Sequence, residues 1–178
     1  MVERVEYSVA TRSGSLEFRD YPAIALATVR GMSDNEAFGL LFDYISGDND
    51  SSSRIAMTAP VLSGAVPSEG LPMTAPVVSS VGSLSFVMPS GRKASTLPSP
   101  RDKRISITDV SKRAVAVLRF RGRASPEQVA TKEAELLDLL RQSRIRTVGS
   151  PFLMRYNPPF IPGFLRRNEV GVEVALID

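Results

Sequence analysis

The chain of 178 residues contains no cysteine, no histidine and no tryptophan. These absences exclude zinc sites built from Cys and His and catalysis by a thiol. They also exclude a histidine general base and a histidine or cysteine ligand to haem iron. The protein must fold without disulfides, and its length and composition allow it to do so without a metal.

Long apolar runs and a strong charge excess are missing as well. No stretch of about 18 apolar residues is available for a membrane span, and Met1 to Arg4 lack the basic-then-apolar pattern of a signal peptide. The formal net charge is +3, with 22 Lys and Arg scattered among 19 Asp and Glu. This mixture does not favour nucleic-acid binding. We therefore expect a cytoplasmic protein with no membrane span and no nucleic-acid partner.

The remaining composition, with 43% hydrophobic and 23% charged residues, is typical of a globular domain. A chain of this length buries roughly 70% of its unfolded surface. Ser90 to Arg104 holds Gly91, Pro98 and Pro100 among charged and small residues, which is typical of a loop rather than a long linker. The sequence therefore predicts a single domain over residues 1–178, and it leaves the oligomeric state open.

One pentapeptide, Met-Thr-Ala-Pro-Val, occurs twice, at Met57 to Val61 and at Met73 to Val77. The alanine before each proline is pushed into an extended conformation, and the proline cannot donate to a sheet ladder. Each copy is therefore expected at an edge or an end of a strand. Between the copies, Ser63 to Pro72 is either a hairpin turn or a disordered insertion.

An internal duplication is suggested by two similar segments, Phe18 to Gly31 and Thr108 to Gly122. Each contains a short strand, a turn, an apolar strand and a glycine, which gives halves of about 5–90 and 103–177. Capping boxes follow, formed by Ser33 with Glu36 and by Ser125 with Gln128. They predict helices over about 34–45 and 126–142, each with one apolar stripe.

Strands are expected after each helix, over 55–62 and 84–88 in the first half and over 152–156 and 169–176 in the second. Alternation is clear in the last of these, where Val170, Val172 and Val174 oppose Glu169 and Glu173. Each half therefore has the order ββαββ. The fold class is α+β, with two pseudo-repeated halves.

Five motifs, in this order, resemble those of the SOUL haem-binding protein family. They are Arg54 to Val61 (RIAMTAPV), Leu84 to Pro89 (LSFVMP), Leu97 to Asp102 (LPSPRD), Tyr156 to Pro159 (YNPP) and Phe164 to Val170 (FLRRNEV). The resemblance covers about Val5 to Leu176, and the doubled MTAPV resembles the microbial members of the family. Which copy occupies the family's strand is open.

The resemblance implies a distorted β-barrel flanked by two helices, similar to the GyrI-like effector-binding domains. It also implies binding of haem or another porphyrin in a shallow cleft along the first helix and near the loop before the last strand. An axial histidine, proposed for one member of the family, cannot occur in this chain. Carried over to this sequence, the resemblance predicts tetrapyrrole-binding residues at Phe38, Leu41, Phe42, Tyr44, Ile45, Tyr156, Pro158, Pro159, Phe160, Ile161 and Phe164.

Two arginines beside that loop, Arg166 and Arg167, are the predicted partners of the propionates, because a guanidinium binds carboxylates with two hydrogen bonds. Each of these assignments has a structural alternative. The helix stripe with Phe38, Leu41 and Phe42 fits a core, with Tyr44 at its flank. The loop residues fit a seal over the open end of the barrel, and the arginines fit pairing with Glu169 or Glu173.

Other chemistry is less favoured by the residues present. Met57, Met73, Met88, Met154, Tyr44 and Tyr156 are the remaining candidate iron ligands, but a methionine in a strand is usually core. Glu169 offers a second hypothesis, in which a partly buried carboxylate with a raised pKa binds cationic molecules or acts as a general base. The neighbouring arginines oppose this, since a cation acidifies a carboxylate.

We therefore expect a protein that binds haem or a related tetrapyrrole reversibly, for carriage, buffering or sensing. No catalytic residue and no metal site is predicted, and the sequence favours a binding protein over an enzyme. Two alternatives stay open: a GyrI-like module that sequesters or hydrolyses small molecules with Glu169, and a protein-interaction module that docks through Phe160 to Phe164.

Overall fold

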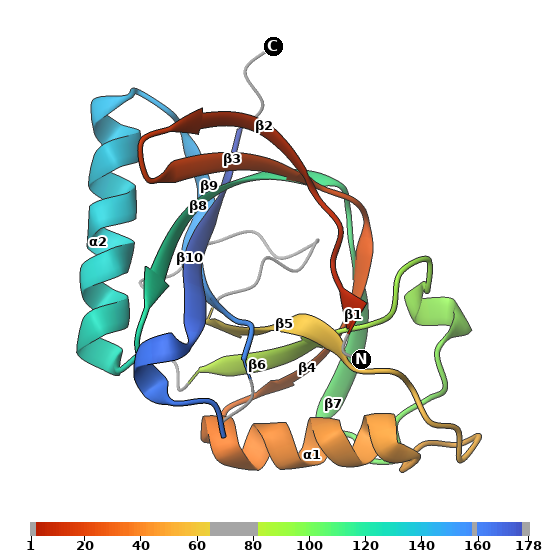
Figure 1. Ribbon diagram of the computed structural model, residues 1–178. Coiled ribbons are helices and arrows are strands. Elements are labelled where there is room, and N and C mark those ends of the chain that lie inside the picture. The colour runs from red at the N-terminus through yellow and green to blue at the C-terminus, as the bar shows by residue number, and fades with distance from the viewer. Residues whose placement is uncertain (1–2, 65–81, 158–159, 176–178) are drawn as a thin grey trace. The chain divides into compact units, whose positions relative to one another are not determined.

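The computed structural model describes residues 3–64, 82–157 and 160–175. Antiparallel strands and two α-helices confirm the predicted α+β class (Figure 1). The second MTAPV copy, at Met73 to Val77, and the predicted site residues Pro158 and Pro159 lie outside the described residues. Neither of the described α-helices is long and apolar enough to cross a membrane.

The elements follow the predicted ββαββ order twice. The first set is β3 (Leu16–Tyr21), β4 (Ile24–Arg30), α1 (Asp34–Ser46), β5 (Thr58–Gly64) and β6 (Ser83–Val87). The second set is β7 (Ile105–Val110), β8 (Arg113–Arg121), α2 (Pro126–Gln142), β9 (Thr147–Arg155) and β10 (Arg167–Val174). Two short strands, β1 (Glu3–Arg4) and β2 (Ser8–Ser13), precede both sets.

The packing divides the chain into two units whose membership differs from the two sequence halves. Unit 1 contains residues 1–5 and 23–111, and unit 2 contains residues 6–22 and 112–178. The reason is an exchange of strands: β3 pairs with β8 and β4 pairs with β7, both antiparallel. Each half therefore contributes its first strand to the unit of the other half. A single domain over 1–178 stays a prediction.

In unit 1 the strands follow the order β5, β6, β4 and β7, and β1 lies parallel to β5. The first MTAPV copy enters β5 at Thr58, as predicted for an extended segment. Its pairing with β6 shifts register between Thr58 and Val61, at the position of Pro60. The shift fits a residue with no N–H to donate to the ladder.

In unit 2 the order is β2, β3, β8, β10 and β9. The helix α2 contacts β8, β9 and β10, so it covers one face of this sheet (Figure 1). Its core contains Leu136 and Leu140 of the helix against Leu118, Val170 and Val172 of the strands. The equivalent core of unit 1 packs Leu41 and Ile45 of α1 against strand residues that include Phe86.

Helix ends follow the predicted signals with one correction. At α1, Ser33 and Glu36 form the complete capping box, and Gly47 ends the helix with φ 122°, a conformation that favours glycine. At α2, Ser125 accepts from the Gln128 N–H, but the Gln128 side chain does not return to Ser125. It accepts instead from the Ala124 N–H at 3.1 Å and donates to the Arg121 carbonyl at 2.9 Å. The second capping box is therefore only half formed.

Candidate functional site

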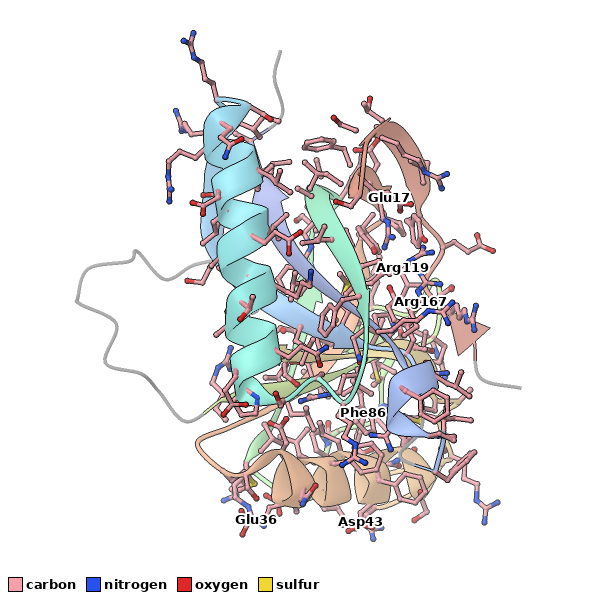
Figure 2. All side chains as sticks on the ribbon, turned by 60° about the vertical axis from the view of Figure 1, so that its left-hand side comes forward. Glu17, Glu36, Asp43, Phe86, Arg119 and Arg167 are labelled. Atoms are coloured by element: carbon pink, nitrogen blue, oxygen red, sulfur yellow. The ribbon has the colours of Figure 1, made fainter. Side chains whose placement is uncertain are left out.

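The face of the unit 2 sheet away from α2 carries charged side chains from three strands. Side chains alternate across a strand, so the residues that flank Val170 in β10 point away from the apolar core. Glu169 lies opposite Arg119 of β8 and Met154 of β9. In Figure 2, Glu17, Arg119 and Arg167 follow one another along the side of this sheet that lies away from α2.

Glu169 is the centre of this cluster and is completely buried. Its Oε2 accepts from Arg19 Nη1 at 2.6 Å and from the Tyr156 hydroxyl at 2.7 Å. Its Oε1 accepts from Arg19 Nη2 at 3.0 Å, Arg119 Nε at 3.2 Å and Arg167 Nη2 at 2.6 Å. The carboxylate is therefore surrounded by three guanidinium groups and one phenol.

Arg19 is as deeply buried as Glu169 and has a partner for each of its nitrogen atoms. Its Nε and Nη2 donate to Glu17 Oε2 at 2.8 and 2.6 Å, and Nη1 also donates to the Tyr21 hydroxyl at 3.2 Å. The guanidinium carbon lies 4.2 Å from the centre of the Tyr7 ring, at cation–π distance. Arg19 and Glu169 thus form a buried bidentate ion pair between β3 and β10.

These contacts fix the protonation states of the cluster. Burial acts to raise the pKa of Glu169, but the Arg19 hydrogen bonds and charge outweigh it and lower the pKa to about 2. Burial likewise opposes the charge of Arg19, and the hydrogen bonds to Glu169 and Tyr21 raise its pKa overall. Burial raises the pKa of Tyr156. At neutral pH Glu169 and Arg19 are therefore charged and Tyr156 is neutral.

The hypothesis of a raised Glu169 pKa is therefore wrong, because the pKa is lowered. The sequence indicated that Arg167 would pair with Glu169 and lower its pKa. The strongest partner, however, is Arg19, which comes from the other end of the chain. A general base needs a pKa near the working pH. With its pKa near 2 and its oxygen atoms occupied, Glu169 is a poor proton acceptor.

Of the predicted loop residues, Phe160, Ile161 and Phe164 lie in a turn that ends in η2, a 3-10 helix at Gly163–Leu165. Phe160 and Phe164 are 82% and 74% exposed, and Leu165 is half exposed. Arg166 Nε donates to the Ile161 carbonyl at 2.7 Å, which closes the turn on itself. Within this turn the structure thus presents two aromatic side chains to solvent rather than burying them.

The predicted helix residues divide into core and surface. Leu41, Tyr44 and Ile45 are buried in unit 1, while Phe42 is 48% exposed. This corrects the predicted stripe: Phe42 lies outside the core and Tyr44 lies inside it. The buried face centres on Ala37, Leu41 and Tyr44, and the Tyr44 hydroxyl reaches the Pro98 carbonyl at 2.9 Å, so a polar tip is compatible with burial.

Phe38 is half-buried and its ring stacks against Phe42, with centroids 6.2 Å apart. Phe38 also meets the ring of Phe86, which Figure 2 places between α1 and its sheet. Burial raises the pKa of Tyr44 to about 12, so this phenol stays neutral. The helix residues belong to unit 1 and the loop residues to unit 2, and a common cleft for them stays a prediction.

Several members of the charged cluster were not identified from the sequence: Tyr7, Glu17, Arg19, Tyr21 and Arg119. A signal was present in β3, where Glu17 and Arg19 stand in a strand with Leu16, Phe18 and Tyr21. A charge in the middle of a strand requires a partner if the strand is covered on both faces. The sequence does not reveal which strand supplies that partner, since the pairing of β3 with β8 spans most of the chain.

Candidate iron ligands are few. Met88 and Met154 are 2% exposed, and the sulfur of Met154 lies 4.0 Å from the Tyr21 hydroxyl and 3.9 Å from the Tyr156 hydroxyl. Tyr156 donates its proton to Glu169 and Tyr44 donates to Pro98. Within the described parts of the chain, no three His, Cys, Asp or Glu residues are grouped so that they could hold a metal ion.

Solved structures share this fold at low sequence identity. The crystal structure of the EcmrR C-terminal domain has a TM-score of 0.60 and 9% identity, and the match covers 96% of this chain and 99% of that one. An uncharacterized conserved protein from Listeria innocua has a TM-score of 0.58 and 13% identity, with 90% and 92% covered. A hydrolase from Listeria innocua has a TM-score of 0.54 and 11% identity, with 93% and 94% covered.

The TM-scores establish a common fold, and they agree with the predicted α+β class. No curated protein is similar enough in sequence to count as a match. The model of one protein family, described as SOUL heme-binding protein, matches residues 2–173. Because this match covers nearly the whole sequence, the chain belongs to the SOUL haem-binding protein family.

Proposed function

We propose that the protein binds haem or a related tetrapyrrole reversibly, through apolar side chains and arginines, and without a protein ligand to the iron. Family membership supports tetrapyrrole binding in general. The exposed turn of unit 2 supports the apolar part of the proposal, since Phe160 and Phe164 are 82% and 74% exposed. Exposed aromatic groups on a closed turn are typical of a binding surface.

The residues present fit the organic part of the pigment better than its metal. A tetrapyrrole needs an apolar surface for the ring and cations for its carboxylates, and Arg166 and Arg167 directly follow the turn. An iron ligand is harder to find, because histidine and cysteine are absent from the sequence. Tyr44 and Tyr156 hold their protons in hydrogen bonds to other groups. When bound, haem would supply an iron centre, and the residues of this chain would hold the ring and its carboxylates.

The Glu169 alternatives receive less support. A site for cationic molecules needs an available carboxylate, whereas Glu169 already accepts from Arg19, Arg119 and Arg167. A hydrolase needs a base that takes up a proton near neutral pH, and the pKa of Glu169 is lowered to about 2. We therefore favour a binding protein over an enzyme.

The proposal is tested by titrating the protein with haemin and with metal-free protoporphyrin IX, followed by absorbance. We expect both pigments to bind saturably with one-to-one stoichiometry, because without a protein ligand the iron adds no bond to the chain. Their affinities should lie within about tenfold of each other, which corresponds to about 1.4 kcal/mol. Haemin that binds a hundredfold or more tighter than protoporphyrin would contradict binding without a protein ligand to the iron.

The binding surface is tested with the double variant Phe160→Ser/Phe164→Ser. Both side chains are mostly exposed, so the fold should survive, and both pigments should bind at least tenfold more weakly. The matched control is Phe42→Ser, an exposed phenylalanine of α1 in unit 1. If Phe42→Ser alone weakens binding, the pigment uses the predicted helix and not the turn.

Unsaturable association that is equal in all variants would contradict tetrapyrrole binding altogether. Sedimentation of the same variants then tests the remaining alternative, a protein-interaction module. Concentration-dependent association that disappears in Phe160→Ser would identify the turn as a protein-docking surface.

A further inference from the structure

The charged cluster of unit 2 holds more hydrogen-bond donors than Glu169 can satisfy. A carboxylate oxygen offers about two lone-pair positions. Oε1 of Glu169 accepts from Arg19 Nη2 and Arg119 Nε, and also from both Nε and Nη2 of Arg167, at 3.1 and 2.6 Å. The donors must share these positions, so part of their capacity is unused by Glu169.

The cluster also holds more positive than negative charge. Arg19, Arg119 and Arg167 all contact Glu169, and Glu17 is the second carboxylate that contacts Arg19. Three positive charges therefore face two negative charges. Glu17 is shared in turn with Arg12, whose Nε lies 3.2 Å from Glu17 Oε1, so the second carboxylate does not remove the excess.

The excess charge is accessible at two of the three arginines. The Arg19 side chain is completely buried, but the side chains of Arg119 and Arg167 are 50% and 29% exposed. Because both contact the same oxygen atom, their guanidinium groups are neighbours, and like charges this close repel each other. Among the described residues, Arg119 donates to Glu169 through Nε alone. Arg167 is further fixed by the Tyr156 ring, 4.4 Å from its guanidinium carbon.

We propose that Arg119 and Arg167, both held by Glu169, form a clamp for a carboxylate group of the ligand. A carboxylate fits because a guanidinium binds it with parallel hydrogen bonds, and because its negative charge would offset the positive excess of the cluster. In a tetrapyrrole the group is a propionate, so the inference rests on the proposed function and replaces Arg166 by Arg119 in the predicted pair. Arg166 instead uses its Nε within the turn.

The clamp is tested with protoporphyrin IX and its dimethyl ester, which carries the same ring without charged carboxylates. We expect Arg119→Gln to weaken binding of the free acid about tenfold at low salt and to leave the ester unchanged. Added NaCl should weaken free-acid binding more in the wild type than in this variant, because salt screens an exposed charge pair. The control is Arg141→Gln on α2, which also removes an arginine from an ion pair and should change neither.

If Arg119 only supports the fold, Arg119→Gln should weaken binding of the acid and the ester equally. This result would overturn the clamp while leaving tetrapyrrole binding intact. A second measurement does not depend on pigment binding at all. The arginine Nε–H NMR signals of the free protein are followed while succinate and, separately, inorganic phosphate are added. Saturable shifts at Arg119 and Arg167, and none at Arg141, are expected with succinate.

The two anions distinguish a carboxylate from a phosphate as the group that the clamp binds. Shifts with succinate that exceed those with phosphate support a carboxylate clamp, whereas shifts with phosphate alone overturn the assignment to a carboxylate. Absence of any shift overturns the clamp whether or not pigments bind. If the shifts occur but neither pigment binds, the clamp stands and the tetrapyrrole proposal fails.

Discussion

The two units have the same kinds of elements but differ in the side chains on the sheet face that the helix does not cover. In each unit a helix covers one face and forms an apolar core. On the other face, unit 1 pairs two small hydroxyl groups, with Thr28 Oγ1 and Ser85 Oγ 2.8 Å apart. Unit 2 instead buries three charged residues, Arg19, Arg113 and Glu169. In the described residues of unit 1 the buried polar side chains are all uncharged.

This difference indicates that the ββαββ architecture does not require buried charge. Taking an ion pair out of water costs several kcal/mol for each ion, and well-packed apolar residues often serve stability equally well. Unit 1 is stabilised without such a pair. The charges of unit 2 therefore call for a reason beyond folding, and this supports unit 2 as the part of the molecule that binds the ligand's carboxylates.

The largest effect is expected from breaking the buried pair at Arg19. Arg19→Met removes four hydrogen bonds, two to Glu169 and two to Glu17, and removing one partner of a buried ion pair typically costs about 3 to 5 kcal/mol. Urea denaturation followed by circular dichroism measures this loss. The control in unit 1 is Thr28→Val, for which we expect about 1 kcal/mol. Equal losses in the two variants would contradict the distinction between the units.

The second effect is a pH dependence that belongs to Glu169. Its pKa is about 2 in the folded protein, against an ordinary value of 4.5. A lowered pKa stabilises the fold above the unfolded value and loses this contribution as the pH falls through the folded value. The free energy of unfolding should therefore fall by about 3 kcal/mol between about pH 5 and pH 2. Glu169→Gln should flatten the profile in this range.

A partly exposed carboxylate in unit 1, Asp102, provides the control for that experiment. Hydrogen bonds from Arg104 lower the pKa of Asp102 to about 2 as well. This pair is at the surface, so 1 M NaCl should screen it, and the pKa of Asp102 measured by NMR should rise toward its ordinary range. The pKa of Glu169 should change much less. A salt response of Glu169 as large as that of Asp102 would show that the cluster is hydrated.

The third prediction is that the two buried arginines of unit 2, Arg19 and Arg113, contribute differently to stability. Arg113 is 9% exposed, and its Nε and Nη1 have no hydrogen-bond partner among the described residues. Glu173 is 3.9 Å from Nη1, and burial lowers the pKa of Arg113. Arg113→Met removes unsatisfied donors, so the free energy of unfolding should stay unchanged or rise by up to about 2 kcal/mol. A loss comparable to that of Arg19→Met would assign Arg113 an essential ion pair with Glu173.

Local signals in the sequence were sufficient for the elements of the fold. Ser33, Gly47 and Pro126 predict helix ends that agree with α1 and α2, because caps depend on neighbouring residues only. The strands were found with less accurate ends: β5 begins at Thr58 rather than at residue 55, and β9 begins at Thr147 rather than at residue 152. β3 and β7 are exchanged between the units because each pairs with a strand far away in the sequence. Neither the internal repeat nor the hydrophobic periodicity determines such pairings.

The candidate site was predicted only in part for the same reason. Arg167 and Glu169 are two residues apart in the sequence, so their pairing could be proposed from the chain alone. Arg19 is 150 residues from Glu169, and Arg119 is 50 residues away, and only the strand register brings them together. Periodicity also failed to separate Phe42 from Tyr44, because a helix stripe does not define which of its edges faces the sheet.

The smallest effect is expected on the uncharged face of unit 1. Ser85→Ala should cost about 1 kcal/mol, because it leaves the buried Thr28 hydroxyl without its partner at 2.8 Å. Adding Thr28→Val removes the second hydroxyl with little change in shape, so the double variant should be close to the wild type in urea denaturation. In unit 2 the corresponding double change should not restore stability. Removing Arg19 and Glu169 together still leaves Arg119, Arg167 and Glu17 charged. A double variant in unit 1 that loses as much as the sum of its single changes would contradict this account, because it would mean that the two hydroxyl groups act independently and not as a pair.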